Sequence, residues 1–175
     1  MGIPEVKRCD GRNVESFDEY LSRWPSNDYP GFPECLLKNW VYRHWPEFSE
    51  YWHPAGCLSW KYEKKLYSNE KLTEICTFKK MMDAMMFWGD HLFEDSMRQE
   101  SWLGKYMLKN GTCPAPILIL EDAGDVIHPR GRENEKMCVP YQLIEGHMRT
   151  AYLWGMHRNG HAPLKAEHEV WVARV

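Results

Sequence analysis

The stretch that decides the fold is VPYQLIEGHMRTAYLWGM, residues 139–156. Its first part, PYQLIE, is a short apolar run that is typical of a buried strand, and the residues after Gly146 are typical of a helix. Gly146 alone separates the two patterns, so we expect the chain to pass directly from a strand into a helix. This half of the chain is therefore predicted to be of the α/β kind.

The junction itself predicts a phosphate site. The first turn of a helix has unpaired N–H groups and the positive end of the helix dipole, and glycine allows an anion to approach the backbone closely. The turn consists of Gly146, His147, Met148 and Arg149, in which the arginine offers a two-pronged fork to phosphate oxygens. His147 would bind phosphate or act as an acid or base, and Glu145 would act as a base or bind a metal ion. The alternatives are a salt-bridged arginine, a helix-capping histidine and a solvent-facing glutamate.

The flanking segments extend the α/β pattern. A helix is predicted from about 94 to 108, where Asn110-Gly111 would end it, and PILILE, 116–121, is a second strand. HEVWVARV, 168–175, alternates as a terminal strand. The two inner strands are expected to be neighbours, so the loop between them is expected at the same site.

That loop contains charged residues that suit the predicted site. Arg130 and Arg132 are expected to line the phosphate pocket, and Asp122 and Asp125, with Glu145, are expected to bind a metal ion such as Mg²⁺. The alternative is an ordinary solvated loop.

The first half of the chain, 1–95, is predicted to be a helical, aromatic-rich extension. Ser16 or Asp18 would cap a short helix in SFDEYLSRW, and Gly89 would interrupt a long one. The predicted helices cover 16–24, about 33–45 and about 70–88, whereas 47–60 is expected to be a loop or short turns.

The composition limits the classes of function. The chain has 175 residues, 43% of them hydrophobic, which is enough for one domain or for a core domain with an extension. The net charge of −3 excludes a global basic field, so any nucleic-acid site must be local. Its six cysteines include no CxxC pair, which argues against a zinc ribbon. No apolar leader or membrane span is visible, and we expect a cytoplasmic location.

The aromatic and methionine residues predict either packing or binding. Nine Trp and nine Tyr are most simply explained by packing, although they would also suit stacking on bases. Met81, Met82, Met85 and Met86 would form a helix core or, if exposed, a face that binds a protein partner.

From about residue 100 to 175, the order of helix, Asn-Gly stop, Pro-Ile strand, loop and YxLIxGxxR strand resembles the ParB/sulfiredoxin superfamily. Met148 departs from the pattern, since many relatives carry His or Arg there. A cysteine, which the sulfinic acid reductases need, is replaced by His147. The matching positions are Leu103, Gly111, Pro116, Ile117, Ile119, Tyr141, Leu143, Ile144, Gly146, Arg149, Ala151 and Gly155.

The resemblance implies a small mixed-sheet α/β domain, 96–175, that binds the phosphates of a nucleotide such as CTP or ATP with Mg²⁺. With the extension 1–95 packed on it, the expected fold class is α+β, and both parts are expected to form two domains or one compact unit. The expected function is binding of nucleotide or nucleic-acid phosphate, with metal-assisted NTP hydrolysis, phosphoryl transfer or nuclease activity as its enzymatic form. The alternative is a non-enzymatic interaction subunit of a toxin-antitoxin or anti-phage assembly, which would bind its partner through the aromatic and Met-rich helices.

Overall fold

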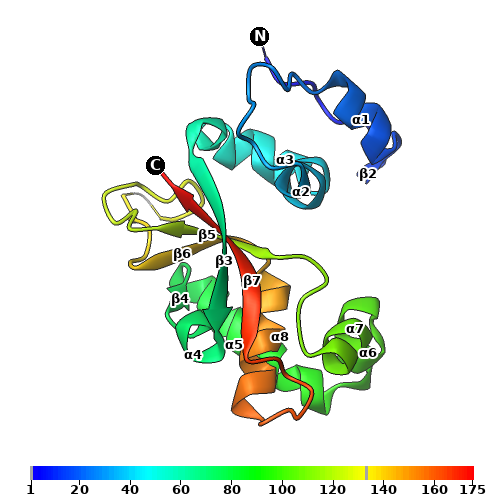
Figure 1. Ribbon diagram of the computed structural model, residues 1–175, viewed down its shortest axis with the longest axis vertical. Coiled ribbons are helices and arrows are strands. Elements are labelled where there is room, and N and C mark those ends of the chain that lie inside the picture. The colour runs from blue at the N-terminus through cyan, green and yellow to red at the C-terminus, as the bar shows by residue number, and fades with distance from the viewer. Residues whose placement is uncertain (1, 133) are drawn as a thin grey trace. The chain divides into compact units, whose positions relative to one another are not determined.

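The computed structural model describes residues 2–132 and 134–175, which divide into two compact units. The N-terminal unit extends to Tyr62, and the C-terminal unit is Glu63–Arg174. The division therefore lies after Tyr62 and not near residue 95, because the long helix predicted before Gly89 belongs with the sheet. The α/β character expected from the sequence is confirmed, since helices accompany a five-stranded mixed sheet (Figure 1).

The N-terminal unit consists of short elements around an aromatic core. Its first helix is capped as predicted: the Ser16 hydroxyl accepts a hydrogen bond from the Glu19 N–H, and the Glu19 carboxylate accepts one from the Ser16 N–H. Trp40 and Phe48 are almost completely buried and meet edge to face, with centroids 5.2 Å apart. The elements are β1 (Arg8–Cys9), β2 (Arg12–Asn13), α1 (Phe17–Arg23), α2 (Glu34–Leu36), the π-helical η1 (Leu37–Tyr42), α3 (Trp45–Glu47), the π-helical η2 (Phe48–Trp52) and the 3₁₀ turn η3 (Cys57–Ser59).

The segment 47–60 is predicted as a loop or short turns, and the structure forms it from short helical elements, namely the end of α3, η2 and η3. Pro46 does not end a helix here. It lies in the first turn of α3, where its missing N–H would have had no partner in any case. The aromatic residues of the segment bury one face, and this packing favours helical turns despite a sequence interrupted by proline and glycine.

The C-terminal unit is built on a sheet with the strand order β3-β7-β5-β6-β4. β5 is central, with its four residues from Ile117 to Leu120 buried; it pairs in parallel with β7 and antiparallel with β6. β4 pairs in parallel with β6 at the edge. The elements are β3 (Lys61–Ser68), α4 (Asn69–Leu72), β4 (Ile75–Cys76), α5 (Lys79–Glu94), α6 (Ser96–Glu100), α7 (Trp102–Asn110), β5 (Ile117–Glu121), β6 (Tyr141–Glu145), α8 (His147–Arg158) and β7 (Glu167–Arg174).

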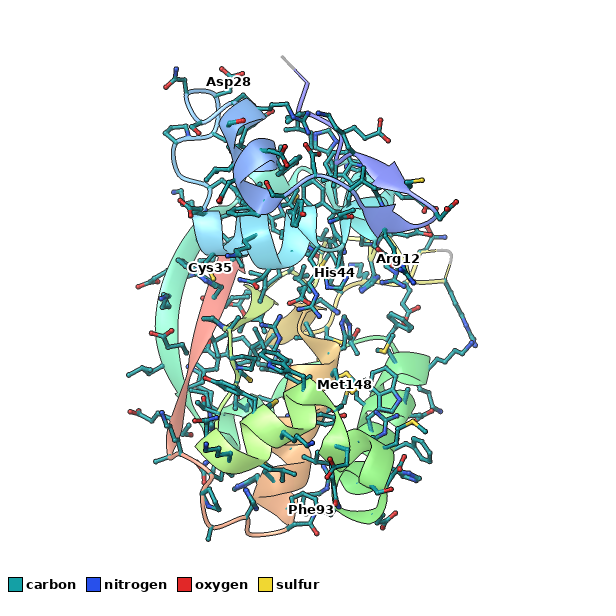
Figure 2. All side chains as sticks on the ribbon, turned by 90° about the vertical axis from the view of Figure 1, so that its right-hand side faces the viewer. Arg12, Asp28, Cys35, His44, Phe93 and Met148 are labelled. Carbon is teal, nitrogen blue, oxygen red and sulfur yellow. The ribbon has the colours of Figure 1, made fainter. Side chains whose placement is uncertain are left out.

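Two helices, α5 and α8, pack against each other and share the core beneath the sheet. They cross at two glycines: a Cβ on Gly89 would lie 2.5 Å from the Ala151 carbonyl oxygen, and a Cβ on Gly155 would lie 2.2 Å from that of Gly89. Met148 lies at one end of α8 and Phe93 lies beside the other (Figure 2). Small residues at the crossing let the two backbones approach closely.

Gly89 therefore does not interrupt a helix, and this prediction is wrong. The glycine lies inside α5 because the neighbouring helix leaves no room for a side chain. The continuous helix predicted over 70–88 is also wrong, since α4, β4 and a connecting segment precede α5. By contrast, the stop at Gly111 is confirmed, with a φ of 64° at the end of α7.

Among the described residues, no helix is both long and apolar enough to cross a membrane.

Candidate functional site

The predicted junction between strand and helix forms as the sequence indicates. β6 ends at Glu145, Gly146 has a φ of 100°, and α8 begins at His147. A Cβ on Gly146 would lie 2.7 Å from Cγ2 of Ile117. Glycine is thus required here by the backbone conformation and by the close packing of the turn on β5, without reference to a ligand.

Arg149 is directed toward acceptors of the protein itself. Its Nη1 donates to the carbonyl oxygens of Ala115 and Pro116, at 2.7 and 3.0 Å, and its Nη2 donates to the Glu145 carboxylate. Arg149 is only 9% exposed. These contacts tie the first turn of α8 to the end of β6 and to the segment before β5. The carboxylate of Glu145 also places a negative charge beside the positive end of the helix dipole.

The other residues of the turn are partly exposed. The thioether sulfur of Met148 accepts a hydrogen bond from Nη1 of Arg98, at 3.4 Å, and the Arg98 guanidinium lies over the Trp88 ring, 5.9 Å from its centroid. His147 begins the helix, as predicted. The structure therefore brings Glu145 and the predicted turn together. The charges of Glu145 and Arg149, however, are paired with each other.

The acidic residues predicted to bind a metal ion make other contacts. Asp125 pairs with Lys136, with 3.2 Å between Oδ1 and Nζ, and Glu145 pairs with Arg149. Asp122 lies in a turn with a φ of 54°, and its N–H donates to the Pro140 carbonyl. Among the residues the structure describes, no group of three or more His, Cys, Asp or Glu side chains is placed to hold a metal ion. The Mg²⁺ site stays a prediction.

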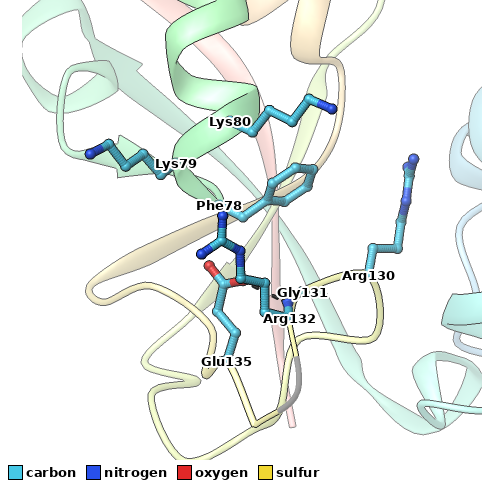
Figure 3. A pocket seen from close by; sticks show the side chains of 7 residues that line it. All are labelled: Phe78, Lys79, Lys80, Arg130, Gly131, Arg132 and Glu135. Atoms are coloured by element: carbon cyan, nitrogen blue, oxygen red, sulfur yellow. Dashed lines mark hydrogen bonds between the residues drawn. The ribbon is translucent and has the colours of Figure 1, made fainter.

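Arg130 and Arg132 line a pocket at a different helix start. We call it the basic pocket: about 390 Å³, lined by Phe78, Lys79, Lys80, Arg130, Gly131, Arg132 and Glu135. Figure 3 shows that the lysines come from the first turn of α5 and the arginines from the loop between β5 and β6, with the Phe78 ring between them. Four of the seven lining residues are cationic, and Glu135 is the one acidic residue among them.

The start of α5 adds partial positive charge to this pocket. Phe78 is the N-cap residue, and no side chain caps the helix there. Its carbonyl oxygen accepts from the N–H groups of Met81 and Met82, at 2.9 and 3.1 Å, so the helical hydrogen bonds begin beyond the two lysines. The N–H groups of Lys79 and Lys80 precede these bonds, and the dipole of this 16-residue helix favours an anion at its start.

The arginine-bearing loop is held in place by its own hydrogen bonds. The His128 N–H donates to the Glu135 carbonyl at 2.7 Å, and the Arg132 N–H donates to the Glu135 carboxylate at 2.8 Å. His128 Nδ1 accepts from the Arg130 N–H at 3.0 Å, and its ring meets Phe78 edge to face. Burial lowers the pKa of His128, in agreement with an unprotonated Nδ1 that accepts a hydrogen bond.

A buried glutamine joins the two segments that line the pocket. Gln142 in β6 is 1% exposed, and its Nε2 donates to Oγ1 of Thr77, which directly precedes Phe78. Its Oε1 accepts from the Cys138 N–H at 3.0 Å, at the end of the arginine-bearing loop. The side chain of one strand residue thus positions both the start of α5 and the end of the loop.

The sequence predicts Arg130 and Arg132 at a phosphate site, but it does not predict that Lys79 and Lys80 lie with them. The Lys-Lys pair was placed inside a long helix, where two lysines are ordinary surface residues. The signal that would have found them is the strand propensity of Ile75-Cys76, which implies that a second helix begins at Lys79.

Comparisons of the chain with protein-family models, with curated proteins and with solved structures found no match. The likeness to the ParB/sulfiredoxin superfamily therefore rests on the sequence pattern alone and stays a prediction.

Proposed function

We propose that the chain binds the phosphate groups of a nucleotide in the basic pocket. The observation that supports this proposal is a pocket at the start of a long helix that is lined by four cationic residues and one acidic residue. A volume of about 390 Å³ lies within the range of roughly 300–1,000 Å³ that is usual for small-molecule sites.

Each part of the pocket has a chemical task in this proposal. The ammonium groups of Lys79 and Lys80 neutralise phosphate charge, and the guanidinium groups of Arg130 and Arg132 offer paired donors to phosphate oxygens. The ring of Phe78 supplies an apolar wall for the base or the ribose. We place the phosphate here and not at the turn 146–149, because Arg149 already has three acceptors within the protein.

Titration calorimetry at low ionic strength tests the proposal. The ligands are CTP, ATP, inorganic triphosphate and a short single-stranded DNA, which separate a nucleotide from a bare phosphate chain and from a nucleic acid. Lys80→Glu and Arg132→Glu should each weaken nucleotide binding about 10-fold or more, because one hydrogen bond to a charged group contributes about 1.5–3 kcal/mol and about 1.4 kcal/mol is a factor of ten.

Lys109→Glu is the matched control, since it makes the same charge reversal in the last turn of α7, outside the pocket lining. Nucleotide binding that is absent from the wild-type chain, or unchanged in both pocket variants, would refute the proposal. DNA binding with no nucleotide binding would assign the pocket to nucleic acid.

The enzymatic form of the proposal is phosphoryl transfer or phosphodiester cleavage. Release of inorganic phosphate from CTP or ATP, or cutting of a plasmid, is measured with and without Mg²⁺. His147 and Glu145, the catalytic side chains predicted from the sequence, belong to the turn at Gly146 and not to the lining of the basic pocket, so His147→Gln should leave any such activity of the pocket unchanged.

A second proposal is an interaction subunit, which is supported by an exposed apolar surface on the C-terminal unit. Phe87, Met97 and Trp102 are 53%, 78% and 68% exposed. A pocket of about 240 Å³ lies beside Met82 and Met86 of α5, and its other lining residues are Thr73, Trp154 and Arg158. Phe87→Asp should then abolish stoichiometric co-purification of one protein partner. Leu66→Asp, at another exposed apolar residue, should leave it intact.

A further inference from the structure

Two cysteines flank the segments that form the basic pocket. Cys76 is the last residue of β4 and lies three residues before Lys79. Cys138 follows the loop that carries Arg130 and Arg132. Each of the two segments that supply the cationic side chains therefore has a cysteine next to it in the sequence, Cys76 before one and Cys138 after the other.

The sheet brings these thiols together although they are far apart in sequence. β4 and β6 pair in parallel with Cys76 opposite Gln142, and the Gln142 side chain accepts from the Cys138 N–H at 3.0 Å. Sγ of Cys76 donates to the Tyr141 carbonyl at 3.5 Å. Both cysteines are reduced and neither is fully buried.

We propose that Cys76 and Cys138 form a reversible disulfide when the protein meets a peroxide. They lie on neighbouring segments of the C-terminal unit, whereas Cys9, Cys35 and Cys57 belong to the other unit. Gln142 links the two segments through its strand pairing with Cys76 and through the hydrogen bond that its side chain accepts from the Cys138 N–H. The cross-link would join the start of α5 to the arginine-bearing loop covalently, where Gln142 now joins them by hydrogen bonds.

The reaction with hydrogen peroxide proceeds in two balanced steps. The thiolate of one cysteine attacks the peroxide, which yields a sulfenic acid and, after protonation, one water molecule. The second thiol then loses its proton and attacks the sulfenic sulfur, so that the S–S bond forms and a second water molecule leaves. The two thiols are oxidised by two electrons, and the peroxide is reduced.

The order of the two steps follows from the surroundings of Cys76. Burial, together with the neighbouring Cys138, raises the pKa of Cys76 to about 12, so its thiol stays protonated near neutral pH. We therefore assign the first attack to Cys138 and the second to Cys76. Formation of the disulfide should accelerate as the pH rises.

The test uses the full chain, treated with hydrogen peroxide at pH values from neutral to mildly alkaline. Remaining thiols are alkylated with N-ethylmaleimide, and the protein is digested without reductant for mass spectrometry. We expect two of the six cysteines to escape alkylation, a peptide pair linked through Cys76 and Cys138, and recovery of both thiols with dithiothreitol. Cys76→Ser and Cys138→Ser should each abolish the linked pair, whereas the matched control Cys35→Ser should retain it.

Three results would overturn the proposal: alkylation of both cysteines after a reference dithiol peptide has been fully oxidised, a disulfide between other cysteines, or a sulfinic acid at Cys138 without any link. The wild-type digest decides among them even if a serine variant folds poorly. The result is independent of phosphate binding, since it needs no ligand.

Discussion

Replacing Arg149 with methionine tests whether this side chain serves the fold or a ligand. The substitution keeps most of the aliphatic length but leaves the Glu145 carboxylate and the carbonyl oxygens of Ala115 and Pro116 without their donor. Breaking a buried ion pair by removing one partner costs about 3–5 kcal/mol. The Glu145 side chain is 16% exposed, so water reaches part of it and the lower end applies. We expect a loss of about 3 kcal/mol in the free energy of unfolding.

Urea denaturation measures this loss. With a slope of about 2 kcal/mol per molar urea, the midpoint of the C-terminal unit should fall by about 1.5 M. Adding Glu145→Gln to the variant removes the uncompensated charge and should recover part of the loss. The control is Lys105→Met, which removes an exposed lysine that pairs with the exposed Glu100 and should change the midpoint little.

The nucleotide affinity of the Arg149→Met variant shows whether Arg149 serves a ligand instead of the fold. On our reasoning, the folded Arg149→Met protein binds CTP or ATP as the wild type does, because the basic pocket is untouched. An unchanged urea midpoint together with a nucleotide affinity weakened 10-fold or more would refute the reasoning and return the phosphate to the turn at Gly146.

Three further predictions concern the folded state. Gly155→Ala should lower the free energy of unfolding by about 1–3 kcal/mol, because the added Cβ would meet the backbone of Gly89. Gly31→Ala places its Cβ in open space and should not lower it, and urea denaturation of both variants measures the difference. Burial lowers the pKa of His168 below 6.5, so the unfolded chain takes up a proton more readily than the folded chain. The free energy of unfolding should therefore be steady above about pH 6.5 and fall below it. His168→Gln should flatten this decline. Ser16→Ala removes the cap of α1 and should cost about 1 kcal/mol by thermal or urea denaturation of the N-terminal unit.

Local patterns predicted the second half of the chain well. The runs PILILE and PYQLIE are too short and apolar to be anything but buried strands, and the structure confirms β5 and β6 in these places. Gly146 and the Asn-Gly pair at 110–111 predict positive φ angles, which glycine adopts readily. The structure has these angles at Gly146 and Gly111, and it confirms the start of α8 and the end of α7.

The same patterns failed where packing outweighs local preference. β3 is missing from the prediction because its sequence, KYEKKLYS, has four charged residues and no regular alternation of apolar and polar types, and it forms a strand through its pairing with β7. Gly89 was interpreted from helix propensity alone, although the contact with Gly155 explains it. The exposed Trp102 also departs from the packing expected of the tryptophans, whereas Trp40, Trp45, Trp52 and Trp60 are buried as expected.

The sequence by itself determined the alternation of strand, turn and helix around Gly146, because those preferences act between residues that are close along the chain. Only the tertiary structure decided which charges meet. It pairs Arg149 with Glu145 at the turn, and it brings Lys79 and Lys80 to Arg130 and Arg132 across about 50 residues of chain. Coulomb attraction and repulsion depend on distance in space, and the pairing of β4 with β6 sets that distance for the basic pocket.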